Sequence, residues 1–422
     1  MKRKAAKANK DPESEKDPHL RESLNDVRFA VFAILLRFLF SSYLYDWARE
    51  RVELVTPVFS YEQLLDDLEM KKDGLPLYTF PHFHNAPMMM WIYSSVSYFG
   101  KHSVLAFSCL LDVSVAWLLK WTADAVKSKK EGEAAGCGRW LFRTYLFNPI
   151  TIASCAICSL STLYNFLAAL SAYLFFSGCL MGYVVVLGIW TSWTVYPAIL
   201  FNILFVLDLP KRQLGIYLGV GLAVVTAISS VHFWSQGSLE FLDSSYFYML
   251  TFKDITPNVG LYWYFFVQVF DHFREFYVLT FMTFYWFVPV PLTMSIRGDP
   301  HLLFWLFLLL SSVFFPSPTL NTATVVFSLW PIFLKRYGEY WRYTLLIVAT
   351  IVTCVTLMPV MWHMWMVSSS GNANFYFGVT LTYNIAMIYM VIDGTFVYFR
   401  DQTNDYFKDW KSRHMGFAYA FH

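Results

Sequence analysis

The chain has 422 residues, of which 57% are hydrophobic, 20% are aromatic and only 15% are charged. Soluble domains carry about 25% charged residues, so this composition argues against a soluble enzyme, a disordered chain or a small disulfide scaffold. The formal net charge of +2 gives no electrostatic footprint for nucleic acid, and we expect no nucleic-acid partner.

The N-terminal segment, residues 1–26, is polar, of mixed charge and rich in lysine. This composition predicts a cytosolic, disordered, basic tail. The apolar run that follows, 27–45, is long enough to stay in the membrane, so the N-terminus does not read as a cleaved signal peptide.

Long apolar runs then recur as far as residue 398 and predict repeated bilayer crossings of about 20 residues each. We expect an all-α integral membrane protein with about twelve transmembrane helices in a polytopic domain over 27–398. The spans 180–195 and 196–209 are short, and they stand or fall together because removing both leaves the sidedness unchanged. The predicted crossings are 27–45, 103–124, 140–156, 161–178, 180–195, 196–209, 213–233, 276–295, 301–316, 318–334, 343–366 and 375–398.

The distribution of lysine and arginine sets the orientation. Most of these residues fall on one side of the predicted membrane, as the positive-inside rule requires of the cytosolic side. We therefore expect both termini to be cytosolic, including a C-terminal tail over 399–422. The loops expected in the lumen are 47–102, 234–275 and 367–374, with a short turn at 314–319.

Three basic residues flank predicted helix ends at the cytosolic interface: Lys211, Arg212 and Arg297. A basic residue there is worth about 1 kcal/mol against an anionic membrane surface. We expect contacts with anionic phospholipid headgroups, and ordinary topology signalling explains the same positions equally well.

The first lumenal loop resembles the start of membrane glycosyltransferases that use dolichol-linked sugars. Those enzymes place a carboxylate pair early in this loop as a base or metal ligand. Here the stretch reads Glu53-Leu54-Val55, so the second acid is missing. The apolar stretch 86–99, led by Pro87, is too short to cross the bilayer and predicts an interfacial helix.

Other polar pairs in this loop give weak chemical signals. Asp67 and Glu69 are two residues apart, but Leu64 and its apolar neighbours favour an amphipathic interfacial helix with a solvated acidic face. His82 and His84 have no nearby acidic or third histidine partner. We therefore expect hydrogen-bonded interfacial histidines, no metal site and no cofactor.

The six cysteines mostly lie inside apolar runs. Cys155 and Cys158 form a C-x-x-C spacing, but neither a second pair nor clustered histidines accompany it, as a zinc site would require. Structural thiols that behave as small hydrophobes are the favoured interpretation.

The second lumenal loop ends in a segment over 254–273. Asp254 or Thr256 could cap a helix with Pro257 in its first turn, and the aromatic run 262–266 suits the lipid–water boundary. Two interpretations stay open. One is an aromatic-belt helix, and the other is a lumenal lipid or headgroup surface that includes His84, Asp254 and Asn258.

The last lumenal loop leads into the twelfth predicted helix, which Asn372 and Asn374 open. Asparagine is a good helix cap. One cap is enough, however, and two amides at a helix N-terminus in the headgroup zone also make a site for phosphate or hydroxyl groups. Within the helix, Thr380 and Asn384 share a face, and an asparagine inside a span needs a polar partner from a neighbouring helix or a lipid.

At these residues the sequence resembles the PIG-U family, a membrane subunit of the GPI transamidase of the endoplasmic reticulum. The matching segments occur in the family's order and extend from about residue 28 to 400. They are ERVELVTP (50–57), FHNAP (83–87), LFNPITIASC (146–155), DITPNVGLYWYFF (254–266), FDHF (270–273), and MPVMWHMW with SGNANFYFGVTLTYN (358–384).

PIG-U proteins look like degenerate relatives of the GPI mannosyltransferases, so the resemblance implies a glycosyltransferase-C-like architecture with lumenal interfacial helices. The family's complex cleaves a C-terminal signal and joins the new carboxyl end to the ethanolamine of a GPI lipid. The resemblance implies a non-catalytic subunit that recognises GPI, because the cysteine-protease chemistry belongs to another subunit. The implied partners are that subunit, companion membrane subunits, GPI and phospholipids.

The family also places the GPI headgroup near the asparagines of the last block. The resemblance, together with the helix pattern, gives an expected GPI-binding set of Asn372, Asn374, Phe375, Tyr376, Thr380 and Asn384.

Two other functions stay in view. An active lumenal mannosyltransferase that uses dolichol-phosphate-mannose would need the carboxylate pair that Val55 interrupts. A lipid scramblase or transporter would need polar residues along a path through several helices, and Asp112 and Asn384 are too few for that.

Overall fold

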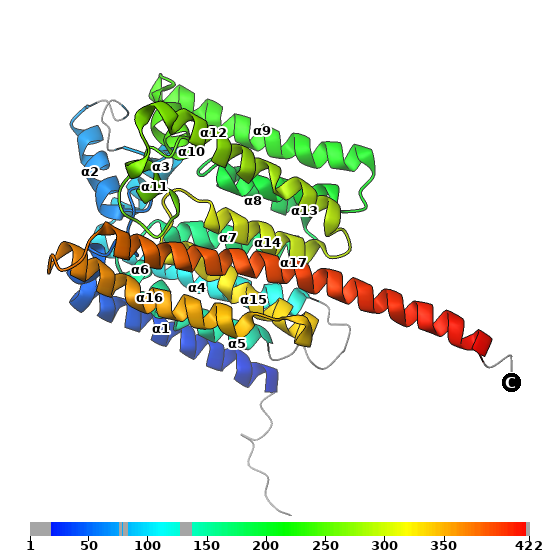
Figure 1. The fold of residues 1–422 in the computed structure, drawn as a ribbon. Helices are drawn as coiled ribbons and strands as arrows, with labels where there is room; N and C mark the ends of the chain where they lie inside the picture. The colour runs from blue at the N-terminus through cyan, green and yellow to red at the C-terminus, as the bar shows by residue number, and fades with distance from the viewer. Residues whose placement is uncertain (1–17, 76–77, 79–82, 127–136, 419–422) are drawn as a thin grey trace, which may run out of the picture.

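The computed structural model describes residues 18–75, 78, 83–126 and 137–418. Every regular element in these ranges is helical (Figure 1). The predictions for residues 1–17 of the N-terminal tail, for His82 and for residues 419–422 of the C-terminal tail lie outside the described residues.

Six helical stretches in the described ranges are long and apolar enough to cross a membrane. Only 6% of the residues in the most apolar stretch of α9 are buried inside the protein, whereas 56% of the residues in the corresponding stretch of α4 are buried. Exposed apolar side chains are stable against lipid tails, which are as apolar as leucine, so the less buried stretches form the outside of the bundle. The six are α1 Pro18–Arg49, α4 Lys101–Ala125, α9 Lys211–Gln236, α12 Asp271–Phe287 continued by α13 Pro289–Ser295, α16 Thr344–Met366 and α17 Ala373–Ala418.

Shorter helices fill the centre and one end of the bundle. In α14, Pro300–Val313, every residue from Leu302 onward is buried. At about 1.5 Å per residue, a helix of this length is shorter than the ~30 Å bilayer core. The others are α2 Tyr61–Lys72, α3 Pro87–Ser97, α5 Cys137–Leu146, α6 Pro149–Ala156, α7 Ser161–Phe176, α8 Leu180–Thr191, η4 Tyr196–Phe205, η5 Leu242–Phe247, α10 Tyr248–Leu250, α11 Tyr262–Gln268, η6 Leu320–Ala323, α15 Thr324–Tyr337 and η7 Gly338–Tyr340.

The predicted crossing over 140–156 is not one continuous helix, because the helical conformation is interrupted between α5 and α6 at Asn148. Pro149 lacks an N–H group and disfavours the helical conformation in the residue before it. The side chain of Asn148 then caps α6 by accepting a hydrogen bond of 3.0 Å from the Ile150 backbone N–H. This proline effect corrects the sequence-based prediction.

The weakest predicted pair, 180–195 and 196–209, forms α8 and the 3₁₀ helix η4. The hydroxyl of Tyr183 on α8 donates to the Leu200 carbonyl at 2.9 Å, which joins the two elements. A 3₁₀ helix rises about 2 Å per residue, so the ten residues of η4 extend less far than the bilayer core.

Both ends of the described chain are more helical than the sequence suggests. Residues 18–26, expected to be disordered, form the start of α1, where Asp26 pairs with Lys120 at 2.6 Å. Helix α17 continues past residue 398 to Ala418. The start of α1 and the end of α17 lie at the same end of the bundle, which we call the tail end (Figure 1).

Two oppositely charged residues are paired inside the bundle. Arg37 on α1 donates through Nε to a carboxylate oxygen of Asp112 on α4 at 2.8 Å, and both side chains are fully buried. The Tyr145 hydroxyl donates to the other oxygen at 2.9 Å. Since an unpaired buried charge is strongly destabilising, this contact fixes α1, α4 and α5 relative to one another.

Buried polar contacts continue from this ion pair toward the opposite end of the bundle. Asn165, beside Tyr145, donates to the Asn321 carbonyl at 2.9 Å. The Asn321 amide donates to Ser161 at 2.8 Å. Besides Asp112 and Asn384, the interior therefore holds further polar residues, and these are bonded to one another. We call Arg37, Asp112, Tyr145, Asn165, Ser161 and Asn321 the inner polar chain.

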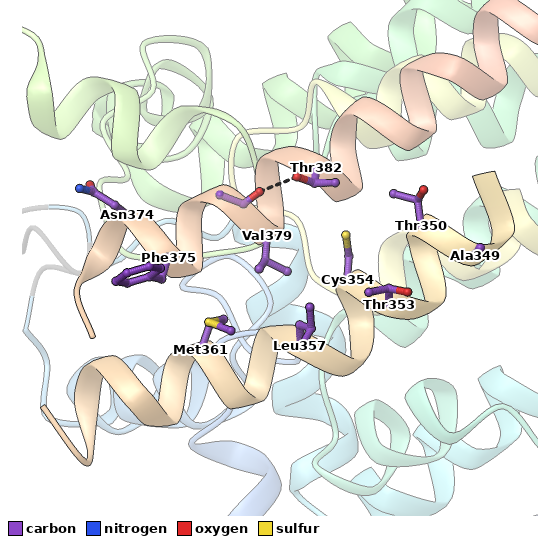
Figure 2. Close-up of a pocket in the computed structure, with 11 residues that line it drawn as sticks. Ala349, Thr350, Thr353, Cys354, Leu357, Met361, Asn374, Phe375, Val379 and Thr382 are labelled. Carbon is purple, nitrogen blue, oxygen red and sulfur yellow. Dashed lines mark hydrogen bonds between the residues drawn. The ribbon is translucent and has the colours of Figure 1, made fainter. Parts of the chain in front are cut away.

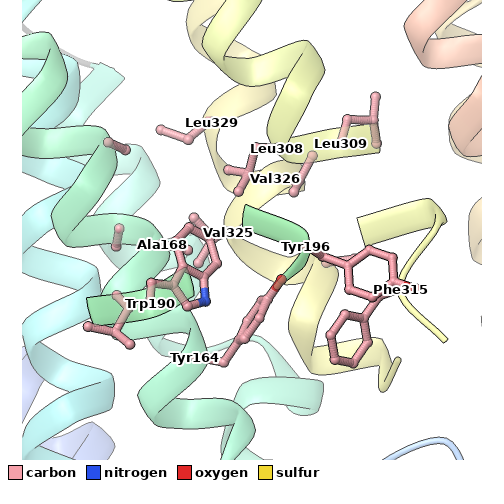
Figure 3. Packing of buried hydrophobic residues seen from close by; sticks show 14 of the residues in the cluster. Tyr164, Ala168, Trp190, Tyr196, Leu308, Leu309, Phe315, Val325, Val326 and Leu329 are labelled. Atoms are coloured by element: carbon pink, nitrogen blue, oxygen red, sulfur yellow. The ribbon is translucent and has the colours of Figure 1, made fainter. Parts of the chain in front are cut away.

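Aromatic side chains pack around the inner polar chain. Tyr164 is 5.0 Å from Trp190 and 5.9 Å from Phe315 between ring centroids, and the three come from separate parts of the sequence (Figure 3). Edge-to-face and tilted aromatic contacts of this kind stabilise a core beyond the area that they bury.

Candidate functional site

Three loops meet at the end of the bundle opposite the tail end, which we call the loop end. The backbone N–H of Leu320 donates to the Glu53 carbonyl at 2.9 Å. The hydroxyl of Thr56 donates to the Ser317 carbonyl at 3.0 Å. These contacts join loop 50–60 to loop 314–320, so the loop end is a defined surface.

Loop 254–261 is the third member and is built around two buried polar side chains. Asp254 accepts from the Thr256 N–H at 3.0 Å and also from the Ser317 hydroxyl. Asn258 accepts from the Gly260 N–H at 2.7 Å. A side chain at Gly260 would approach Pro318 to 2.7 Å, so the close packing of these two loops requires glycine there.

The residues expected on a lumenal surface are instead buried. His84, Asp254 and Asn258 are 9%, 3% and 0% exposed. His84 stacks on Tyr248 and bonds to the Ser244 carbonyl at 3.1 Å. The interpretation as an exposed headgroup surface is corrected, because these polar groups satisfy loop backbone and neighbouring side chains.

The N-terminus of α17 lies beside this junction. The side-chain oxygen of Asn372 accepts from the Asn374 backbone N–H at 3.0 Å, which is the predicted capping contact. The side-chain oxygen of Asn374 accepts from the hydroxyl of Tyr264 on α11. Both asparagines are exposed, so the fold brings the second and last predicted lumenal loops together at this point.

Aromatic rings surround the two asparagines. Tyr264 stacks on Phe377 with centroids 4.6 Å apart. Trp263 stacks on Trp365 at 6.2 Å, and Trp365 packs against Trp362 at 5.3 Å. Aromatic side chains are typical of the lipid–water boundary, so this cluster suits the depth of the lipid headgroups.

An open groove of about 540 Å³ begins at Asn374 and runs between α16 and α17 (Figure 2). Its walls are apolar apart from a few threonines. The lining residues are Ala349, Thr350, Thr353, Cys354, Leu357 and Met361 on α16, and Asn374, Phe375, Gly378, Val379 and Thr382 on α17.

The predicted GPI-binding set divides between the two faces of α17. Asn372, Asn374 and Phe375 are exposed. Tyr376, Thr380 and Asn384, in contrast, are buried at 0%, 0% and 1%. The Asn384 amide donates at 2.8 Å to the Val259 carbonyl and to the Thr380 carbonyl. Asn384 therefore has a protein partner, and it anchors α17 to loop 254–261.

Two carboxyl groups at the loop end are buried. Glu53 is 4% exposed, and burial raises the pKa of its carboxyl even though Arg51 opposes the shift. Burial, helped by repulsion from Asp66, raises the pKa of Asp67 to about 7. The predicted solvated acidic face therefore holds for the exposed Glu69 but is wrong for Asp67, which α2 turns inward.

The three basic residues expected to meet anionic lipid are exposed. Lys211 and Arg212 begin α9, and Arg297 follows α13. Arg297 lies at the tail end, since the N–H of its neighbour Gly298 donates to the hydroxyl of Tyr398 on α17 at 2.9 Å.

Sequence reasoning missed two parts of the site. In the sequence, Tyr264 is only one member of an aromatic run, and nothing in its spacing relates it to Asn374. The face of α16 that lines the groove could have been found in the sequence, because Thr350, Cys354 and Leu357 recur at the three- and four-residue spacing of one helix face.

Comparison with known proteins gives one family. The sequence matches the PIG-U family, described as GPI transamidase subunit PIG-U, over residues 29–383. It is similar to the GPI-anchor transamidase component PIGU of Cricetulus griseus and of Homo sapiens, with 26% identity over 407 residues in each case. Those alignments cover 88% of this chain and 92% of the relative. It is also similar to the GPI transamidase component GAB1 of Saccharomyces cerevisiae, with 27% identity over 349 residues, 82% of this chain and 86% of the relative.

Proposed function

The chain belongs to the PIG-U family of GPI transamidase subunits, and on this basis we propose that it recognises the GPI lipid in the groove between α16 and α17. It is a non-catalytic component of the GPI transamidase and a multi-pass membrane protein of the endoplasmic reticulum. The remaining subunits of that complex are its partners, and the transfer chemistry belongs to them.

The mouth of the groove suits the polar head of the lipid. The side-chain oxygens of Asn372 and Asn374 accept hydrogen bonds from the protein, so their NH₂ groups are the donors that remain for a ligand. The N-terminus of α17 adds the positive end of the helix dipole, which favours a phosphate.

The body of the groove suits acyl chains. The observation that carries this proposal is continuity, because Asn374 and Phe375 belong both to the exposed mouth and to the apolar groove below it (Figure 2). A lipid has the same order of parts, with a polar head joined to apolar chains. Tyr376, Thr380 and Asn384 support the site from the inner face of α17.

A glycine on the groove wall provides the sharpest test. Gly378 is exposed, and a Cβ added there meets nothing within 4 Å. Gly378→Leu should therefore leave the fold intact, with a helix-propensity gain of up to about 1 kcal/mol, while the leucine side chain occupies the groove. We expect less GPI to co-purify with the complex and less GPI-anchored protein at the surface of a null cell line that expresses the variant.

Gly215→Leu on α9 is the matched control, because Gly215 is also exposed in a helix with nothing within 4 Å of an added Cβ. It lies outside the groove, so GPI recovery should stay at the wild-type level. Normal complex assembly and normal anchoring with Gly378→Leu would refute the groove as the lipid site.

The alternative, an active dolichol-phosphate-mannose-dependent mannosyltransferase, does not fit a non-catalytic component. Glu53 is 4% exposed, so its carboxyl offers little access to a lumenal sugar donor. Val55 occupies the position of the second acid.

For the topology, we propose about twelve crossings in a glycosyltransferase-C-like arrangement, with both termini cytosolic and the loop end in the lumen. In this arrangement α5 and α6 together make one crossing, while α8 and η4 form a short hairpin. The shared position of the chain ends (Figure 1) and the exposed Lys211, Arg212 and Arg297 support this orientation. A glycosylation sequon inserted at the exposed Gly74 should be modified, whereas one inserted after Gln402 should not.

A further inference from the structure

Two thiols from different helices meet inside the bundle. The Sγ atoms of Cys109 on α4 and Cys155 on α6 are 3.7 Å apart, and the two residues are 1% and 0% exposed. We propose that Cys109 and Cys155 are a modification site at which oxidation forms a disulfide between α4 and α6.

The two sulfur atoms that meet belong to Cys109 and Cys155, which are not the C-x-x-C pair of the sequence. A disulfide needs the sulfur atoms to approach from 3.7 Å to about 2.0 Å, which side-chain rotation and a small shift of one helix can supply. Helix α6 has only eight residues, and non-helical residues interrupt the chain on both sides of it. They are Asn148 before the helix and Cys158, with φ of 57°, after it. A short element with a break at each end can move without disturbing a long helix.

The surroundings give the bond a structural effect. Cys109 is one helical turn from Asp112 on α4, so the new link would lie beside the Arg37–Asp112 ion pair. Through α6 it would also hold the segment after Cys158, where the Leu160 N–H donates to the Phe59 carbonyl at 3.0 Å. The disulfide would therefore join the inner polar chain covalently to the element that supports loop 50–60.

The chemistry requires an oxidant that can enter a buried site, and a small uncharged peroxide fits that need. One thiol loses its proton, attacks hydrogen peroxide as the thiolate and becomes a sulfenic acid, while the broken O–O bond releases hydroxide, which takes up that proton as water. The second thiol then attacks that sulfur, forms the S–S bond and releases a second water. Two thiols are oxidised, one peroxide is reduced, and both thiol protons leave in the water molecules.

The test uses the whole complex in digitonin and the wild-type chain. Samples held in dithiothreitol or treated with hydrogen peroxide are denatured in an alkylating reagent and digested without reduction. Mass spectrometry should find a Cys109–Cys155 linked peptide after peroxide, together with loss of alkylation at both positions. Dithiothreitol should reverse both changes, and the thermal midpoint should be higher in the linked sample.

Cys109→Ala should abolish the linked peptide and the rise in the thermal midpoint. Cys179→Ala should change neither, because Cys179 is an exposed thiol that is not part of the pair. Absence of the link in samples where Cys179 is oxidised would overturn the proposal. A Cys155–Cys158 link in its place would overturn it too. Neither result depends on lipid binding, so the test is independent of the proposed function.

Discussion

Polar side chains of the inner polar chain bond to other elements of the bundle, whereas Thr350 and Thr382 of the groove bond to carbonyls of their own helices. Asn165 on α7 donates to Asn321 and to Thr324 at the start of α15. In the groove, Thr350 and Thr382 donate to carbonyls one turn back, at 2.8 and 2.7 Å. The first arrangement fixes helix positions, and the second leaves two helix faces free for an apolar ligand.

Under the proposed function, this difference lets one membrane domain serve both as a scaffold and as a lipid receptor. A buried polar group that loses its partner is costly, so the inner helices have few alternative positions. Thr350 and Thr382 satisfy their hydroxyls within their own helices, so the proposed lipid would enter or leave without exposing these groups unsatisfied. Helix α17 connects the groove to the loop end, because Asn384 on its inner face bonds to Val259 while Thr382 lines the groove.

The largest expected effect comes from breaking the inner region at its ion pair. Asp112→Ala would leave the Arg37 guanidinium buried without its carboxylate, at a cost of about 3–5 kcal/mol. We expect a lower thermal midpoint and less assembled complex in digitonin. The double variant Arg37→Met with Asp112→Leu removes both charges and should recover much of the loss. Wild-type stability of Asp112→Ala would contradict a structural role for the pair.

The next effect should appear at the mouth of the groove, without loss of stability. Replacing Asn372 and Asn374 together by serine keeps helix capping but removes both amide donors. Loss of a hydrogen bond to a charged group costs about 1.5–3 kcal/mol, so GPI recovery should fall more than about tenfold.

The variant Tyr264→Phe separates the two roles of Asn374, because it removes the hydroxyl that bonds to Asn374 and keeps the amide. Near-normal GPI recovery with Tyr264→Phe would show that the amide itself contacts the lipid. Normal anchoring in the double serine variant, with normal assembly, would reduce both asparagines to structural residues.

A smaller effect is expected at the exposed basic residues that begin α9. Lys211→Gln and Arg212→Gln should each weaken retention of anionic phospholipid by about 1 kcal/mol, as measured by native mass spectrometry. Lys253→Gln, at a basic residue of the loop end, is the control and should not change retention. If lipid retention is equal in all variants, the basic residues serve topology alone.

The smallest effect concerns pH at the loop end. Burial raises the pKa of Asp67 to about 7 from an ordinary value of 3.8, so the folded chain holds this proton more tightly than the unfolded chain. Its contribution to stability is fully present below about pH 3.8 and is lost as the pH rises through about 7. Hydrogen exchange in α2 should therefore be faster at pH 8 than expected from intrinsic rates alone.

Asp67→Asn mimics the protonated side chain and should remove this extra pH dependence. Asp66→Asn is the matched control because Asp66 is exposed, and it should leave most of the dependence in place. Equal pH profiles for wild type and Asp67→Asn would show that the Asp67 carboxyl ionises freely in the folded chain.

The sequence determined the features that depend on local patterns. Six of the twelve predicted crossings are, in the described part of the chain, helices long and apolar enough to cross a membrane, since length and composition alone decide that property. The position of Asn372 before an apolar helix predicts a cap, and its bond to the Asn374 N–H confirms this. Family membership is also a property of the sequence alone, because the matching segments follow one another in the family's order along the chain.

Only the tertiary structure decided which polar residues face one another. Arg37 and Asp112 are far apart in sequence, as are Tyr264 and Asn374, and no local pattern encodes such pairs. The same holds for burial, because Asp67 and Glu69 have the same chemistry and lie on one short helix, yet only Asp67 turns inward. The periodicity of the sequence predicts which residues share a helix face. The neighbours that pack against each face decide whether that face contacts protein, lipid or water.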